Sequence, residues 1–300
     1  MLRRPKAATV LVAALSLLPT DCLRADENAA PSDIEHAFDL FEPGVRTFAA
    51  LPDRLRDRAI DQYYTELFQG ARRRPLHAVS DGDAALLYRA AALSALATGH
   101  ARYVRDMRRL LRELEARRTV TPREYAELYR ADVMARDFAD ARRLVSAYPT
   151  LDVEPMPYIR EAAAIHGPSE LLVVPNRYEL VHRPVRLEAE RQIIVVADPL
   201  CHFSQDAVRA IEADPQLASA LARAKWIAPQ GARFAVDAYQ QWNRQHPSAR
   251  LAMAYRNSEW PMIDSWATPT FYVLERGKVV AKIAGWPPEG GRDALYGAAQ

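Results

Sequence analysis

The chain has 300 residues, of which 49% are hydrophobic and 26% are charged, a globular composition that excludes a disordered or collagen-like protein. Its 40 basic and 38 acidic residues give a net charge of +2, so the overall charge gives no indication of nucleic-acid binding. Two cysteines, Cys22 and Cys201, are too few for a disulfide-stapled scaffold or a four-cysteine zinc site.

Residues 1–25 have the layout of a secretory signal peptide. A basic N-terminus precedes a twelve-residue apolar run at 7–18, and residues 23–25 offer a cleavage site. The basic residues are Arg3, Arg4 and Lys6. The run is too short to span a bilayer and no later segment reaches eighteen apolar residues, so we expect no transmembrane span. We therefore predict a periplasmic or secreted protein.

Cleavage after residue 25 changes both the charge and the cysteine count. It removes four basic residues and one acidic residue, which leaves 36 basic residues, 37 acidic residues and a net charge of −1. It also removes Cys22, so Cys201 is the single cysteine of a mature chain in an oxidising compartment, and no internal disulfide is expected. A lipoprotein anchored through Cys22 is an alternative, which Asp21 disfavours because that position normally carries a small residue. A Cys201–Cys201 dimer is a second alternative for an unpaired cysteine.

The region from residue 33 to about 166 has the apolar spacing of helices, and we predict an all-α domain of helical hairpins over 26–167. The expected helices lie at 51–68, 86–97, 103–114, 121–133, 137–148 and 158–165. Gly70 and Gly99 are expected to follow the ends of the first two. The fourth begins with a capping box from Thr121 to Glu124, with Pro122 at its first helical position.

One helical joint resembles part of a tetratricopeptide repeat. The run Arg-Asp-Phe-Ala-Asp-Ala at 136–141 is similar to the joint between the repeat's helices, and Pro149 is similar to its closing proline. The Trp and Gly of the repeat's first helix are absent. The resemblance implies a groove that binds a peptide or protein. The alternative, which we favour, is a hairpin domain that packs against its neighbour.

The apolar period becomes two at about residue 170. Candidate strands lie at 171–174, 178–182, 185–187, 192–197, 225–228, 250–255, 270–274 and 279–283. Helices are expected after the fourth of these and at about 234–245, and residues 275–278 form a hairpin turn. This order predicts an α/β domain with a mixed sheet over 168–300, and an α+β fold overall.

Two segments of this second domain resemble the thioredoxin fold, most closely its secreted disulfide isomerases and oxidases. The strand at 193–197, followed by Asp-Pro-Leu-Cys-His-Phe-Ser at 198–204, is similar to the family's active-site segment. Roughly 70 residues later, Trp-Ala-Thr-Pro-Thr-Phe at 266–271 is similar to its cis-proline segment and precedes a hairpin. The resemblance covers roughly residues 190–287, a third of the chain.

The sequence departs from the family's Cys-x-x-Cys centre, because Ser204 occupies the second cysteine position. At a helix start the Cys201 thiolate is stabilised by N–H groups and the helix dipole, and protonated His202 or the Ser204 hydroxyl would add to this. The resemblance implies that the backbone of Thr268, before a cis Pro269, pairs with a bound substrate chain. Without a resolving thiol, glutathione or a partner protein must release the mixed disulfide.

Two functions stay open at this stage. The first is an exported monothiol protein that forms mixed disulfides through Cys201, with the helical domain selecting periplasmic protein or peptide partners. The second is a redox-inert binding or assembly module in which Cys201 is a buried, unreactive side chain. We favour the first, because Cys201 occupies the position where the fold activates a thiol. The seven histidines lack metal-ligand spacing, so we expect no metal and no resident cofactor, with glutathione as an alternative co-substrate.

Overall fold

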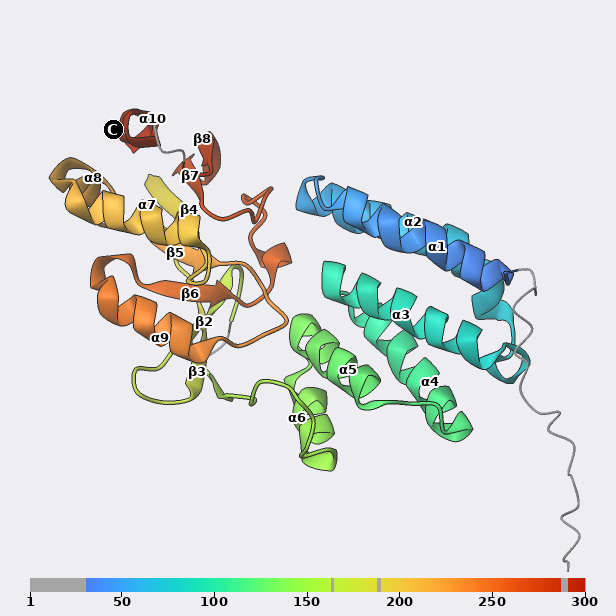
Figure 1. Cartoon of the computed structure of the whole chain (residues 1–300). Helices are drawn as coiled ribbons and strands as arrows, with labels where there is room; N and C mark the ends of the chain where they lie inside the picture. Colours follow the sequence, from blue (N-terminus) through green and yellow to red (C-terminus); the bar gives the residue numbers. More distant parts are fainter. Residues whose placement is uncertain (1–30, 163–164, 188–189, 287–290, 300) are drawn as a thin grey trace, which may run out of the picture.

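The computed structural model describes residues 31–162, 165–187, 190–286 and 291–299, which form a helical part and a sheet part (Figure 1). The predicted signal peptide and Cys22 lie outside these ranges. The α+β class is confirmed, with the helical part first and a mixed sheet second. None of the described helices is long and apolar enough to cross a membrane.

Five of the six helices predicted between residues 33 and 166 are present, and α1 was not among the predicted helices. Its α-helices are α1 (Asp33–Phe48), α2 (Asp53–Arg73), α3 (Asp81–Thr98), α4 (Ala101–Arg117), α5 (Pro122–Ala135) and α6 (Phe138–Ala147). The capping box of α5 is present, since the Thr121 N–H donates to the Glu124 carboxylate at 2.8 Å. Gly99 ends α3 in the left-handed conformation that glycine adopts without strain. The expected end of α2 at Gly70 is wrong, because the helix continues through it to Arg73.

The sheet part contains eight strands in the described residues: β1 (Tyr158–Glu161), β2 (Ser169–Val173), β3 (Glu179–Pro184), β4 (Arg191–Val196), β5 (Lys225–Ala228), β6 (Leu251–Ala254), β7 (Thr270–Glu275) and β8 (Lys278–Ala284). Their order in the sheet is β1-β3-β2-β6-β5-β4-β7-β8. Strands β4, β5 and β6 are mutually parallel, and β7 and β8 continue the sheet antiparallel to β4. The helices are α7 (His202–Ala213), α8 (Pro215–Ala220), α9 (Val236–Gln245) and α10 (Gly291–Ala299).

Two expected elements differ in the structure. The segment predicted as a helix at 158–165 is the edge strand β1, which pairs in parallel with β3 and so belongs to the sheet although it precedes residue 168. The apolar spacing of this segment is helical, but it forms a strand because the backbone of β3 provides hydrogen-bond partners along its length. The predicted strand at 185–187 has no ladder and continues as loop.

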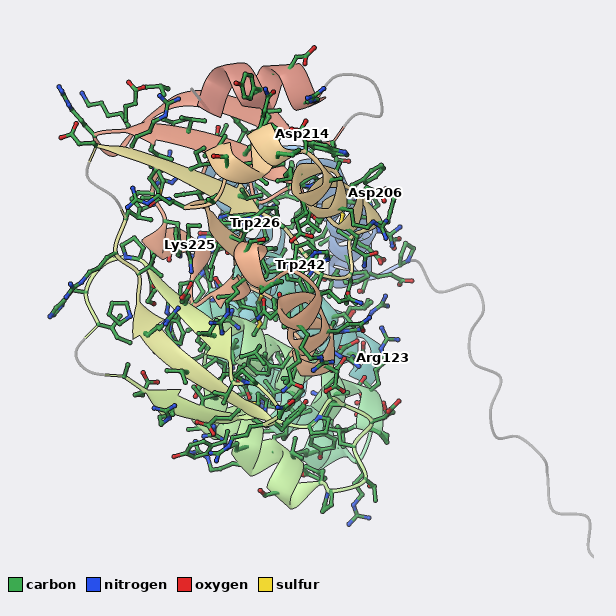
Figure 2. The ribbon with its side chains drawn as sticks, turned by 90° about the vertical axis from the view of Figure 1, so that its left-hand side faces the viewer. Arg123, Asp206, Asp214, Lys225, Trp226 and Trp242 are labelled. Carbon is green, nitrogen blue, oxygen red and sulfur yellow. The ribbon has the colours of Figure 1, made fainter. Side chains whose placement is uncertain are left out.

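The two faces of the sheet are covered differently. Helices α7 to α10 pack on one face, where Trp226 of β5 lies beside Trp242 of α9 with ring centroids 6.1 Å apart (Figure 2). The opposite face is covered by the loop that leads to β7, through the buried side chains of Trp260, Ile263 and Trp266. The thioredoxin-like expectation for the sheet part is confirmed at the level of fold, with a helix after the central strand β4 and an antiparallel hairpin at the chain's end.

The helical and sheet parts share a core. Buried side chains of α5 and α6 belong to the same apolar cluster as those of β2, β4 and α9. Arg136, which ends α5, is only 6% exposed and donates hydrogen bonds to the carbonyls of Gly231 (3.0 Å) and Ala254 (2.9 Å), and to that of Tyr255. Nearby, the Arg256 guanidinium donates to the Ala135 carbonyl at 3.1 Å. The α5–α6 joint therefore docks onto the sheet.

Candidate functional site

Cys201 lies at the N-terminal end of α7, directly after the loop that leaves β4. Asp198 shapes this loop, because its carboxylate accepts the Leu200 N–H at 2.8 Å and its carbonyl accepts the Cys201 N–H at 3.1 Å. The Gln205 N–H then donates to the Cys201 carbonyl at 3.1 Å as the first hydrogen bond of α7. The sequence Asp-Pro-Leu-Cys therefore ends a buried strand and begins a helix with the thiol at its start.

The Cys201 thiol meets the segment that precedes β7. Strands β4 and β7 are antiparallel, with Val196 opposite Thr270, so the loop after β4 and the loop before β7 lie at the same sheet edge. The sulfur donates a hydrogen bond to the Thr268 carbonyl at 3.5 Å, and the Thr268–Pro269 peptide bond is cis, as expected. The structure thus brings together three of the predicted site residues, although 67 positions separate Cys201 from Thr268.

The surroundings of Cys201 favour its thiolate. Partial burial raises the pKa of the thiol, but hydrogen bonds that stabilise the charged form outweigh this, so the pKa lies below the ordinary cysteine value. They come, in decreasing order, from the Thr268 side chain, the backbone and side chain of Ser204, and the Phe203 backbone. The two backbone groups are unpaired N–H groups of the first turn of α7. A lowered pKa increases the fraction of thiolate, which is the nucleophilic form.

Ser204 is part of this site and is fully buried. Its hydroxyl oxygen accepts the Asp198 N–H at 3.2 Å, which ties the first turn of α7 to the preceding loop. Because the hydroxyl oxygen is the acceptor in this bond, its proton stays available to donate, in agreement with the contribution of the Ser204 side chain to the lowered pKa of Cys201. Since oxygen cannot attack a disulfide as a thiolate does, Ser204 supports the first step of exchange and not its resolution.

The rim of the site is exposed and apolar. Leu200 and Phe203, on either side of Cys201 in the chain, are 70% and 48% exposed. His202 is also exposed, and its ring packs against Phe203 with centroids 3.8 Å apart. An effect of His202 on the thiol stays a prediction. Sequence reasoning did not single out Leu200 and Phe203, although large apolar residues at a loop–helix junction are a signal of a contact surface.

The helical part holds the loop that carries Thr268. At the start of α2, the Asp53 carboxylate accepts the Trp266 N–H at 3.0 Å and the Asp53 N–H donates to the Asp264 carbonyl at 3.4 Å. The Arg54 guanidinium donates to the Pro261 carbonyl at 3.2 Å. Sequence reasoning missed this contact, because 213 positions separate Asp53 from Trp266 and no local pattern relates them.

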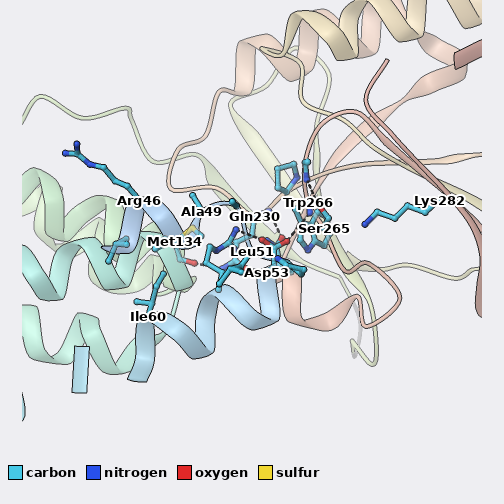
Figure 3. A pocket seen from close by; sticks show the side chains of 18 residues that line it. Arg46, Ala49, Leu51, Asp53, Ile60, Met134, Gln230, Ser265, Trp266 and Lys282 are labelled. Atoms are coloured by element: carbon cyan, nitrogen blue, oxygen red, sulfur yellow. Dashed lines mark hydrogen bonds and ion pairs between the residues drawn. The ribbon is translucent and has the colours of Figure 1, made fainter. Parts of the chain in front are cut away.

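A cleft of about 840 Å³ lies between the two parts, beside this loop (Figure 3). The connection between α1 and α2, residues 49–52, forms one wall, and residues 265–267 form another. Figure 3 shows Arg46 and Lys282 at opposite ends of the cleft. Each is paired with a carboxylate, Arg46 with Glu42 and Lys282 with Asp264, both at 2.8 Å. The cleft therefore carries no uncompensated charge at either end.

No group of three or more His, Cys, Asp or Glu side chains within the described ranges is arranged to hold a metal ion. The groups gathered at the site are a thiol with a lowered pKa, a buried hydroxyl and a peptide backbone next to a proline.

Comparisons with known proteins add little to this geometry. No family model matches the chain, and no curated protein matches it. Among solved structures, the chain is similar to a thioredoxin-like protein from Bacteroides caccae, with 13% sequence identity and a TM-score of 0.29 over 94% of this chain and 99% of that one. A TM-score this low does not carry the fold assignment, which rests on the strand order and on the contact between Cys201 and the cis-proline loop.

Proposed function

We propose that this protein is an exported monothiol thioredoxin-fold protein that forms mixed disulfides with a protein or with glutathione through Cys201. The observation that carries the proposal is the thiol at the start of α7, with its pKa lowered by hydrogen bonds and its sulfur against the Thr268 carbonyl. Export rests on the sequence of residues 1–25.

The exchange conserves disulfides and electrons. The Cys201 thiolate attacks one sulfur of a partner disulfide, a new bond forms between Cys201 and that sulfur, and the second partner sulfur leaves as a thiolate. Ser204 offers no sulfur for an internal second attack. An external thiolate, from glutathione or another protein, must therefore attack the partner sulfur of the mixed disulfide, which regenerates the Cys201 thiolate. The mixed disulfide persists until that thiol arrives.

The cis-proline loop supports a polypeptide or glutathione as the partner. Among the described residues the Thr268 N–H has no hydrogen-bond partner, and its carbonyl meets only the thiol. A backbone with free groups next to the reacting sulfur is suited to pair with an extended chain, as the resemblance to the thioredoxin family implies. The exposed side chains of Leu200 and Phe203 add an apolar contact surface around the thiol.

The test is the pH dependence of Cys201 alkylation in the mature chain, which lacks Cys22. We expect the rate to follow a pKa clearly below the ordinary value of about 8.5, and glutathione disulfide to give a stable adduct on Cys201 under mild oxidation. Cys201→Ser is the control that must show neither reaction.

A pKa at or above about 8.5 without a glutathione adduct would instead support the redox-inert binding module. In the Ser204→Ala variant, which removes one stabilising hydroxyl, we expect the pKa of Cys201 to rise while the adduct still forms.

A further inference from the structure

We infer that the cleft between the helical and sheet parts binds the stretch of partner polypeptide next to its reacting cysteine, in an extended form with apolar side chains. The inference rests on the proposed function of Cys201 and adds the place where the partner is recognised. The helical part contributes to this recognition site, although Cys201, Ser204 and Thr268 all belong to the sheet part.

The first argument is position. Ala267 lines the cleft and is the residue next to Thr268, whose carbonyl lies 3.5 Å from the Cys201 sulfur. Because consecutive Cα atoms are about 3.8 Å apart, a chain bonded to Cys201 and running along this loop enters the cleft within two or three residues. The free Thr268 N–H gives such a chain its first backbone hydrogen bond.

The second argument is the chemistry of the walls. Leu51, Ile60 and Trp266 give the cleft an apolar lining (Figure 3), and its terminal cations are already paired. The lining also includes the polar side chains of Gln230 and Ser265. A peptide carries apolar side chains together with a backbone carbonyl and N–H, so it suits a lining of both kinds better than a purely apolar ligand does.

The third argument is size and access. A volume of about 840 Å³ lies within the range of roughly 300–1,000 Å³ that holds small ligands, so it suits a few residues of chain and not a folded domain. A second groove of about 370 Å³, between α7 and α9, touches Leu200 on the other side of the thiol. It is smaller, and its lining does not include the loop with Thr268.

The experiment compares two disulfide probes, each a mixed disulfide with thionitrobenzoate. One is a heptapeptide with leucines on both sides of a central cysteine, and the other is N-acetylcysteine methylamide. Attack of Cys201 on the cysteine sulfur releases thionitrobenzoate, whose absorbance gives the rate constant. The variants are Ala49→Trp, which fills the cleft from an exposed position, and the matched control Ala116→Trp at the far end of α4. Gln241→Trp blocks the second groove.

We expect wild-type protein to react at least about tenfold faster with the heptapeptide than with the small probe, which corresponds to about 1.4 kcal/mol of recognition. Ala49→Trp should abolish this ratio and leave the small-probe rate unchanged, while Ala116→Trp keeps both. Equal rates for the two probes in wild type, or a ratio that survives Ala49→Trp or is lost in Gln241→Trp, would overturn the inference and leave the reactivity of Cys201 intact.

Failure of wild type to react with either probe would overturn the proposed function instead. The cleft is then tested without chemistry, by fluorescence anisotropy of a labelled heptapeptide with serine in place of cysteine, added to the Cys201→Ser protein. Binding that Ala49→Trp weakens and Ala116→Trp leaves unchanged supports the cleft as the recognition site. Absence of binding, or equal binding in all variants, refutes it.

Discussion

Arg136 joins the helical part to the sheet part, and its replacement by methionine tests how strongly. The side chain is 6% exposed, and its guanidinium donates to three carbonyls across the junction, those of Gly231, Ala254 and Tyr255. Among the described residues no carboxylate forms an ion pair with it. The cation is therefore solvated by backbone carbonyls of the sheet part and by that of Val133 in its own helix, at 3.2 Å.

The magnitude follows from two opposing effects. Methionine leaves three carbonyls without this donor, one buried (Ala254) and two partly buried (Gly231 and Tyr255), at a cost of at most about 2 kcal/mol each, or roughly 6 kcal/mol. It also removes the cost of burying a charge. Burial lowers the pKa of Arg136 to about 10, which corresponds to a desolvation cost of roughly 3 kcal/mol. The loss of hydrogen bonds exceeds the gain, so we expect Arg136→Met to lower the free energy of unfolding by about 3 kcal/mol.

The assay is urea unfolding of residues 26–300, followed by far-UV circular dichroism. Arg143→Met is the matched control, because its side chain is 74% exposed and lies on the same helical pair, and we expect a change below about 0.5 kcal/mol. Arg136→Lys keeps the charge but loses the fork geometry, so it should fall between wild type and methionine. An Arg136→Met variant as stable as the Arg143→Met control would refute the reasoning.

Three further changes follow from the structure. Burial, opposed by Arg108 and Arg143, raises the pKa of Asp132 to about 7. The folded state therefore holds a proton that the unfolded state releases near pH 4, and stability falls as the pH rises between these values. Asp132→Asn should remove this pH dependence of the free energy of unfolding, which amounts to at most about 4 kcal/mol. If the free energies of unfolding of variant and wild type changed equally between pH 5 and pH 8, the prediction would be contradicted. Ser204→Cys should shorten the life of the glutathione adduct at least about tenfold by internal attack on Cys201, as seen by mass spectrometry, and an equally persistent adduct would show that the second position is unreachable. Asp53→Ala removes the hydrogen bond that holds the loop before the cis-proline, so it should raise the pKa of Cys201 as measured by alkylation. Glu66→Ala, at an exposed position of the same helix, is the control and should leave this pKa unchanged. Equal pKa values of Cys201 in the two variants would mean that α2 does not position the loop.

Most helices and strands of this protein can be predicted from short stretches of its sequence. Apolar spacing predicted most helices, the capping box at Thr121 marked the start of α5, and a run of β-branched residues marked β4. The order of Asp198, Pro199 and Cys201 after a buried strand was sufficient to predict a thiol at a helix start. These features depend on backbone dihedral preferences and on contacts within one or two turns, so neighbouring residues are sufficient to specify them.

Only the tertiary structure determined which of these helices, strands and loops contact one another. Residues 158–161 have helical spacing, yet they form β1 because β3 supplies their backbone partners. The pKa of Cys201 is lowered in part by Thr268, 67 positions away, and the loop that carries Thr268 is held by Asp53, which lies 213 positions from Trp266. Such contacts arise from the register of β4 against β7 and from the docking of whole helices, which no local pattern encodes. The sequence alone predicted that the Cys201 thiol begins a helix in a thioredoxin-like sheet domain. The packing of distant segments decided its environment, because burial and long-range hydrogen bonds exist only once the chain is folded.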